Sequence, residues 1–200
     1  NPSQTGNIKY DSMFFYSTSF DQVICGWGDL TRPDTSTLNM FVGSLGSYKE
    51  ECNFKPTNKA DLQAAVDAWC SGDTATYGPI AEWDVSLVTD MSNLFAGKTA
   101  FNDDISAWTM VQVVTIEGMF EEATNFNQSF SSATGGWQTS SVVNMKSVFK
   151  NAVSFDQDLD MWITDRVTTM ESMFEGATAF NSALDGWMMG AVTNLKATFR

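Results

Sequence analysis

The sequence contains no histidine. Histidine is the most frequent general base near neutral pH and the most frequent ligand for transition metals, so its absence excludes the Ser-His-Asp and Cys-His arrangements of nucleophilic catalysis. Long apolar runs are also missing, because none approaches the roughly 20 residues that a membrane-spanning helix needs. We therefore expect no membrane insertion. No secretory signal is visible either, so an exported protein would be represented by a mature form or an internal fragment.

Basic residues are scarce. Lys and Arg total 11 against 24 Asp and Glu, which gives a formal net charge of −13. A surface of this sign repels the phosphates of nucleic acids and anionic membranes, so we expect no nucleic-acid partner. The same charge favours solubility and partners that are basic or cationic, metal ions included.

An internal repeat dominates the second half of the chain. Columns of Val, Met and Phe keep the same spacing as a column of Trp, and the unit reads W-x4-V-x2-M-x2-[ML]-F-x5-F-x6-W. The Trp column is separated by 25, 29, 25 and 25 residues and consists of Trp83, Trp108, Trp137, Trp162 and Trp187. Four extra residues in "SFSSATGG" account for the longer interval, and we expect them to form an outward loop.

One unit cannot fold alone. Its apolar side chains contribute roughly 10–20 kcal/mol on burial, whereas ordering a backbone of this length costs roughly 25–50 kcal/mol. Stacked units share their apolar faces, which is how solenoids become stable. The Val-Met-Met spacing suits a short helical arc, and the Phe-to-Trp half has an extended character. The sequence therefore predicts an α/β repeat: a right-handed, leucine-rich-repeat-like solenoid with coils of about 25 residues, short parallel strands and short helical arcs.

The repeat resembles a known family. "WDVSLVTDMSNLFAGKTAFNDDISAW" and "VTTMESMFEGATAFNSALDGW" are similar to the 26-residue repeat of bacterial surface proteins, of the Mycoplasma and Listeria lipoprotein type. That family is related to BspA-like leucine-rich repeats and is also found in large secreted or surface proteins of marine algae. The resemblance covers residues from about 80 to 200, with a remnant near 7–27. It implies surface display and interaction, and it implies neither catalysis nor a particular ligand.

The resemblance divides the chain into three segments. We expect the terminal coil of a preceding array at 1–27, a junction at 28–79, and a solenoid of about five coils at 80–200 whose last coil is incomplete. Within the junction, Leu62, Ala65, Val66 and Trp69 make one apolar helical stripe. A helix near 58–70, with Asn58 as N-cap, would close the open end of the array.

Three cysteines, Cys25, Cys52 and Cys70, are an odd number, and no CxxC pair indicates a zinc site. One disulfide with one thiol left over suits an oxidising compartment, and three free thiols are the alternative. If 58–70 is helical, Cys52 barely reaches Cys70. We therefore predict a Cys25–Cys52 disulfide.

A polar residue follows the second Phe of each unit, in a column of Asp21, Asn102, Asn127, Asp156 and Asn181. We interpret this column as a polar ladder that bonds turn backbone groups, and a strip that binds a ligand is the alternative. Asn127-Gln128-Ser129 is also an N-glycosylation sequon, so Asn127 is a glycosylation candidate in a secreted chain.

Acidic residues gather in two neighbouring units. Asp160 and Asp185 share a column about 4.8 Å apart, and Asp158 is nearby. Calcium binds through carboxylate oxygens, so these three residues are a candidate calcium site, with solvated surface acids as the alternative. Paired carboxylates could also indicate a hydrolase, but these acids lie on a regular strip with no sign of a pocket.

The sequence therefore predicts a protein that is not an enzyme. We expect an extracellular or cell-surface scaffold, structural or adhesive, with no resident cofactor. Its partners would be proteins, glycans or copies of itself joined end to end in a fibre or coat. The alternatives are a calcium-binding surface module and a hydrolase that uses paired carboxylates.

Overall fold

The computed structural model describes residues 23–25, 47–49, 54–131 and 136–200. The chain divides into two compact units, Asn1–Cys52 and Asn53–Arg200. In the first unit, strand β1 (Val23–Cys25) pairs in parallel with strand β2 (Ser47–Lys49), and Ile24 lies opposite Tyr48. The predicted terminal coil at 1–27 and the Cys25–Cys52 disulfide depend on residues or side chains outside the described part.

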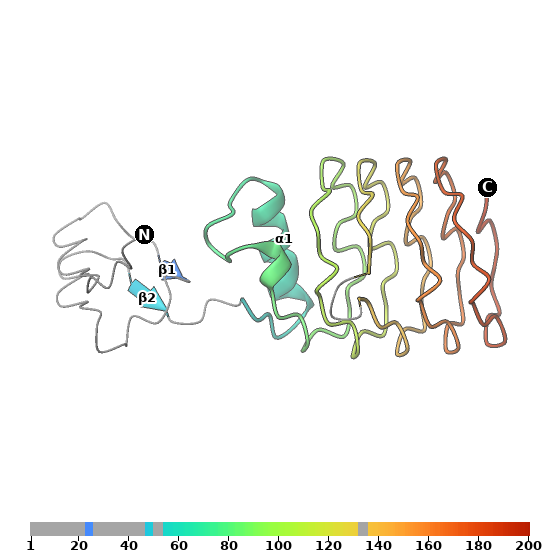
Figure 1. The fold of residues 1–200 in the computed structure, drawn as a ribbon, viewed down its shortest axis with the longest axis horizontal. Helices are drawn as coiled ribbons and strands as arrows, with labels where there is room; N and C mark the ends of the chain where they lie inside the picture. Colours follow the sequence, from blue (N-terminus) through green and yellow to red (C-terminus); the bar gives the residue numbers. More distant parts are fainter. Residues whose placement is uncertain (1–22, 26–46, 50–53, 132–135) are drawn as a thin grey trace, which may run out of the picture. The chain divides into compact units, whose positions relative to one another are not determined.

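Helix α1 (Lys59–Cys70) coincides with the residues over which the apolar stripe predicts a helix. Asn58 is its N-cap, and its side-chain oxygen accepts the backbone N–H of Asp61 at 3.0 Å. The stripe residues Leu62, Ala65 and Val66 are buried. A short 3₁₀ helix, η1 (Ile80–Glu82), follows and leads into the repeats. Figure 1 shows α1 beside the first coil of the second unit.

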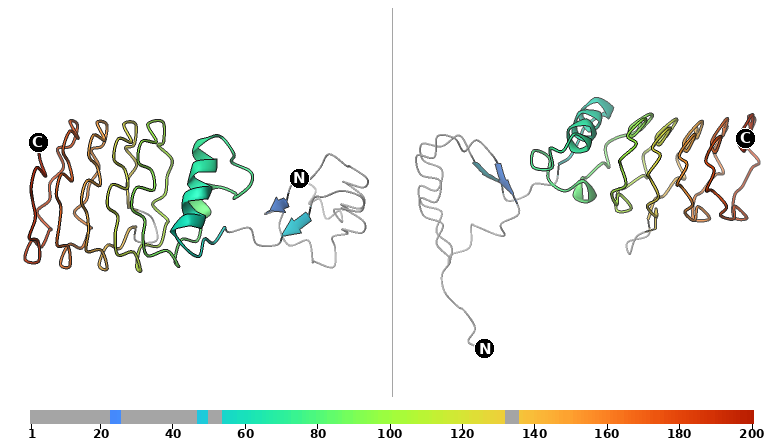
Figure 2. Two further views of the ribbon diagram at one scale, coloured as in Figure 1. Left: turned by 180° about the vertical axis from the view of Figure 1, so that it is seen from behind. Right: turned by 90° about the horizontal axis from the view of Figure 1, so that it is seen from above.

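Five coils stack one on the next, as both views in Figure 2 show. We number them by the Val column: coil 1 is 88–112, coil 2 is 113–141, coil 3 is 142–166, coil 4 is 167–191 and coil 5 is 192–200. Neighbouring coils are joined by isolated parallel bridges, which run Asp90 to Thr115, Thr115 to Asn144, Asn144 to Thr169, and Thr169 to Asn194.

The coils pair through every second peptide group. The N–H groups of Met91, Asn93 and Phe95 donate to carbonyls of the next coil at 2.8–3.0 Å. The intervening peptides form turns inside the coil, such as the bond from the Leu94 N–H to the Met91 carbonyl. The residue five positions after the Val column has a positive φ of 54–62° in every coil: Asn93, Gly118, Ser147, Ser172 and Ala197.

This backbone reversal changes the local structure that the repeat pattern predicts. A strand needs negative φ throughout, and a helix needs consecutive right-handed residues. A left-handed residue in the middle of the segment interrupts both. The bridges and turns both lie in the Val-Met-Met segment, where a helical arc was predicted. The described residues of the Phe-to-Trp half, where a short strand was predicted, form no strand or bridge.

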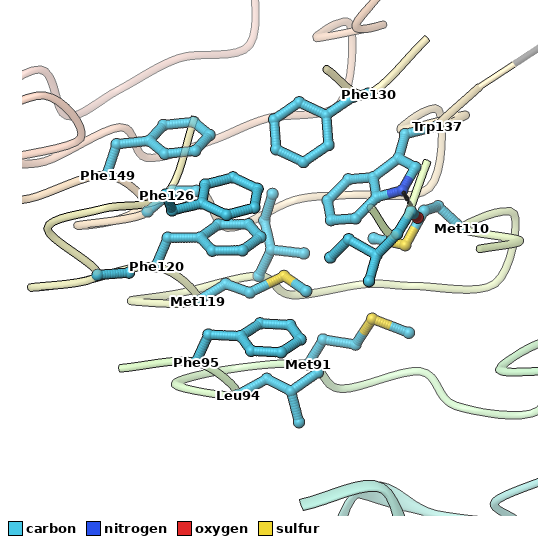
Figure 3. Packing of buried hydrophobic residues seen from close by; sticks show 14 of the residues in the cluster. Met91, Leu94, Phe95, Met110, Met119, Phe120, Phe126, Phe130, Trp137 and Phe149 are labelled. Atoms are coloured by element: carbon cyan, nitrogen blue, oxygen red, sulfur yellow. Dashed lines mark hydrogen bonds between the residues drawn. The ribbon is translucent and has the colours of Figure 1, made fainter. Parts of the chain in front are cut away.

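Aromatic columns fill the interior of the stack. Phe95, Phe120, Phe149 and Phe174 lie ring on ring at centroid distances of 5.4, 5.6 and 5.7 Å, with interplanar angles of 3–13°. All four are buried, and Figure 3 shows three of these rings stacked beside Met91 and Met119. The spacing of these columns along the sequence is therefore the spacing of a shared core.

The hydrogen bonds of the buried Trp side chains differ next to the four-residue insertion. The indole N–H of Trp137 donates to the carbonyl of Ile105 in the preceding coil at 3.0 Å (Figure 3), and that of Trp187 donates likewise to Leu159. The corresponding carbonyl for Trp162 belongs to Phe130, where the insertion begins, and it accepts the backbone N–H of Trp137 at 3.1 Å. The carbonyls of Ile105 and Leu159 accept both such a backbone N–H and an indole N–H, whereas the buried Trp162 Nε1 has no hydrogen-bond partner.

Candidate interaction surfaces

The polar ladder lies on the surface of the stack and links its coils. Oδ1 of Asn102 accepts the backbone N–H of Asn127 at 2.9 Å, Oδ1 of Asn127 accepts that of Asp156 at 3.0 Å, and Oδ1 of Asp156 accepts that of Asn181 at 2.8 Å. All four residues are exposed. Asp21, the remaining member of the column, lies outside the described residues. Each rung fixes an outward side chain in one orientation because that side chain bonds backbone.

Asn127 serves the ladder twice. Its Oδ1 accepts the backbone N–H of Asp156 and also the side-chain amide of Gln157 at 2.8 Å. The side chain is exposed, as a glycosylation site must be. A glycan attached to Asn127 would project from the polar ladder. Glycosylation at this sequon stays a prediction.

The acids predicted to bind calcium are not gathered into a metal site. The Asp158 carboxylate turns back to its own chain and accepts the backbone N–H of Asp160 at 2.8 Å. No group of three or more His, Cys, Asp or Glu side chains in the described part of the chain is placed to hold a metal ion. The exposed Asp160 and Asp185 are thus solvated surface acids in this structure.

A second set of polar columns was not singled out from the sequence. It occupies the positions four and eight residues after the Val column of coils 2 to 5. We name it the charged strip: Glu117, Glu121, Lys146, Lys150, Glu171, Glu175, Lys196 and Arg200. Its sign alternates, because coils 2 and 4 carry glutamates there and coils 3 and 5 carry lysines or arginine. The alternating sign can be seen when the repeats are aligned. It indicates a continuous surface only once neighbouring coils are known to pair in register.

Neighbouring members of the charged strip interact. Lys150 Nζ donates to Glu121 at 2.9 Å, and Lys146 Nζ lies 3.6 Å from Glu171. The hydrogen bond from Lys150 to Glu121, and the charge of that carboxylate, raise the pKa of Lys150. The amide of Asn144 donates to Glu117 at 2.9 Å. These contacts hold side chains that would otherwise be flexible, and they leave the strip partly exposed to solvent.

A hollow lies where α1 meets coil 1 (Figure 1). It has a volume of about 350 Å³, and its walls include Trp69, Cys70, Lys98, Phe101 and Asp103. The indole N–H of Trp69 donates to Asp103 at 2.8 Å. Burial raises the pKa of the Cys70 thiol, which is free. The hollow therefore combines an aromatic wall, a carboxylate and a neutral thiol.

Lys98 distinguishes this hollow from a smaller one of about 180 Å³ at the equivalent positions of coil 4. The equivalent positions in coils 2 to 4 are Ala123, Ala152 and Ala177, which are buried between coils. In coil 1 the side chain meets α1 instead of another coil, and Lys98 Nζ pairs with Asp67 at 2.6 Å. The sequence signal for this hollow is the break in the alanine column at Lys98.

Comparison with known proteins places the repeats in a family. The model of a family described as "Mycoplasma protein of unknown function, DUF285" matches residues 66–134 and 129–200. Searches of curated proteins and of solved structures found no significant match. No helix among the described residues is long and apolar enough to cross a membrane. The matched residues make up more than half of the chain and confirm the resemblance seen in its repeats, and the chain thus belongs to the DUF285 repeat family.

Proposed function

We propose that this protein is a non-catalytic scaffold, extracellular or on a cell surface, that works by contact with other molecules. Its framework would be a right-handed, leucine-rich-repeat-like solenoid, since parallel coils joined in this way favour that hand. Membership of a repeat family of surface proteins supports the location.

The observation that carries this proposal is the polar ladder. Side chains on an adhesive surface are ordinarily free to move, and ordering them on binding opposes association by about 0.5–1.5 kcal/mol each. Here the outward Asn102, Asn127 and Asp156 are fixed by bonds to the next coil. A surface ordered before binding keeps more of its contact energy, and the repeat multiplies each contact along the stack.

Two modes of action remain within this proposal. In the first, the stack binds proteins or glycans along its regular face. In the second, stacks join end to end into a fibre or coat. Electron microscopy of the purified full chain distinguishes them, because filaments indicate assembly and dispersed particles indicate a receptor. An adhesion assay on fibronectin-, fibrinogen- and mucin-coated plates then tests the first mode. A chain that neither forms filaments nor adheres above an albumin control would refute the scaffold role.

The hollow beside α1 is where a glycan contact is best supported. A sugar ring has an apolar face, which suits the indole of Trp69, and hydroxyls, which suit the carboxylate of Asp103 and the ammonium of Lys98. Catalysis is not indicated there, because no second carboxylate among the wall residues is available to pair with Asp103.

Alkylation of Cys70 reports on this hollow directly. Iodoacetamide modification, followed by peptide mapping, is measured with glucose, galactose, mannose or N-acetylglucosamine at about 10 mM, tenfold above a millimolar Kd. At least one sugar should slow modification of Cys70, and Trp69→Ala should abolish that protection while the surface control Asp185→Asn preserves it. Equal rates with every sugar would remove the glycan site and leave the ladder-based proposal standing.

A further inference from the structure

The charged strip is electrically unlike the rest of the repeats. Residues 80–200 contain 6 basic and 15 acidic side chains, a net charge of 6 − 15 = −9. The strip contains four of those basic residues and four of the acidic ones, so its net charge is 4 − 4 = 0. Two copies of this acidic protein therefore repel one another over most of their surfaces and do so least where two strips meet.

The alternation selects the kind of partner that fits. Coils repeat about 4.8 Å apart, so the sign of the strip reverses within a Debye length of about 8 Å. From farther away the charges cancel, and a partner of uniform charge gains nothing. Only a surface with the same spacing and the opposite phase meets every charge with its opposite. The protein's own strip has that spacing.

We propose that two copies of this chain pair antiparallel through their charged strips. A two-fold axis between coils 3 and 4 sets coil 2 opposite coil 5 and coil 3 opposite coil 4 of the second copy. Glu117 then faces Lys196, and Lys146 faces Glu171. In the second column, Glu121 faces Arg200 and Lys150 faces Glu175. Every coil in the strip meets the opposite sign, and the arrangement closes as a dimer.

Other arrangements of two strips match less well. Parallel strips in register oppose like charges in all four coils. Parallel strips shifted by one coil match in three coils and leave a free end, which gives an open filament instead of a dimer. Because exposed ion pairs contribute little individually, and several of these groups already pair within their own chain, the dimer is weak and sensitive to salt. This inference rests on the proposed contact role and adds a specific partner to it.

Two charge-reversal variants of the full chain test the pairing. Lys146→Glu with Lys150→Glu makes coil 3 acidic, so in a homodimer it faces the acidic coil 4. Glu171→Lys with Glu175→Lys makes coil 4 basic, so it faces the basic coil 3. Each variant alone should dimerise at least about tenfold more weakly than wild type in sedimentation equilibrium. Mixed together, the two variants oppose unlike charges in every coil, and a one-to-one heterodimer should recover wild-type affinity.

A matched control reverses two exposed acids outside the strip, Asp158→Lys with Asp185→Lys, and should still dimerise. Circular dichroism confirms that each variant folds, and the milder Lys146→Gln with Lys150→Gln replaces any that does not. Raising the salt from about 0.1 M to 1 M shortens the Debye length from about 10 Å to 3 Å and should dissociate the wild-type dimer. A wild type that stays monomeric, variants that self-associate normally, a mixture that does not recover, or filaments in place of dimers would each overturn the pairing, and none would affect the adhesion assay.

Discussion

Truncating one ring of the Phe column should reveal how stability is distributed along the stack. Phe149 is fully buried in coil 3, with ring centroids of Phe120, Phe155 and Phe174 at 5.6, 3.9 and 5.7 Å. Phe149→Ala removes a buried aromatic side chain, which ordinarily costs 3–5 kcal/mol. Stacking on three neighbours adds about 0.5–1.5 kcal/mol per pair beyond area burial, so we expect a loss of at least about 5 kcal/mol.

Phe199 occupies the same column in coil 5 and provides the control. It is 67% exposed and has one stacked neighbour in the column, Phe174 at 5.4 Å. Burying a third of a Phe side chain stabilises by about 0.5–1 kcal/mol and the one stacked pair adds about 0.5–1.5 kcal/mol, so Phe199→Ala should cost about 1–2.5 kcal/mol. Urea titrations followed by Trp fluorescence and by circular dichroism give both values. Equal losses for the two variants would refute the claim that shared stacking between coils carries the stability.

Four further predictions concern single features of the stack. Both Gly97 and Gly176 have φ near +70°, but only at Gly176 would an added Cβ meet Asn151 Oδ1, at 2.2 Å. Gly176→Ala should therefore lower the free energy of unfolding more than Gly97→Ala does. If the difference between the two variants persists in an Asn151→Ala background, this clash is not its cause. Asn127→Ala removes a ladder acceptor and should cost about 1–2 kcal/mol, whereas Asn181→Ala, whose side chain accepts no described rung, should be close to neutral by the same titration. Trp162→Phe should cost about 1 kcal/mol less than Trp137→Phe, since only Trp137 loses an indole hydrogen bond. The hydrogen bond from Lys55, with that from Ser86, lowers the pKa of Asp84 to about 2. The ionised Asp84 therefore contributes its full stabilisation above the unfolded pKa of about 3.9 and loses it as the pH falls towards 2. In Asp84→Asn the melting temperature should fall less steeply between about pH 4 and pH 2, and an unchanged pH dependence would contradict the assignment.

The spacing of apolar residues determined which side chains are buried. Trp, Phe, Val and Met columns repeat because each coil must bury its apolar face against the next. The buried positions can therefore be predicted from the spacing alone. Helix α1 was equally predictable from the sequence, since Leu62, Ala65 and Val66 fall on one helical face and Asn58 is a favoured N-cap. These inferences depend on local periodicity alone.

Backbone conformation inside each coil could not be inferred in the same way. The Val-Met-Met spacing is compatible with a helical turn, but alternate peptides pair with the neighbouring coil and a residue of positive φ separates them. Four of the five residues at that position are not glycine, so the usual sequence signal of a left-handed residue is missing. Pairing between coils decides the conformation, and pairing is a tertiary property.

The same division applies to the surfaces. The sequence by itself determined the family, the repeat and the column of Asn and Asp residues, because identical chemistry returns at a fixed interval. Only the tertiary structure decided that Asp158 bonds its own chain instead of joining Asp160 and Asp185 around a cation, since a carboxylate's direction depends on the donors nearest to it. It also decided that Glu121 and Lys150, 29 residues apart, are neighbours. Charges on separate turns of a chain acquire an order in space only when the coils that carry them are stacked in register.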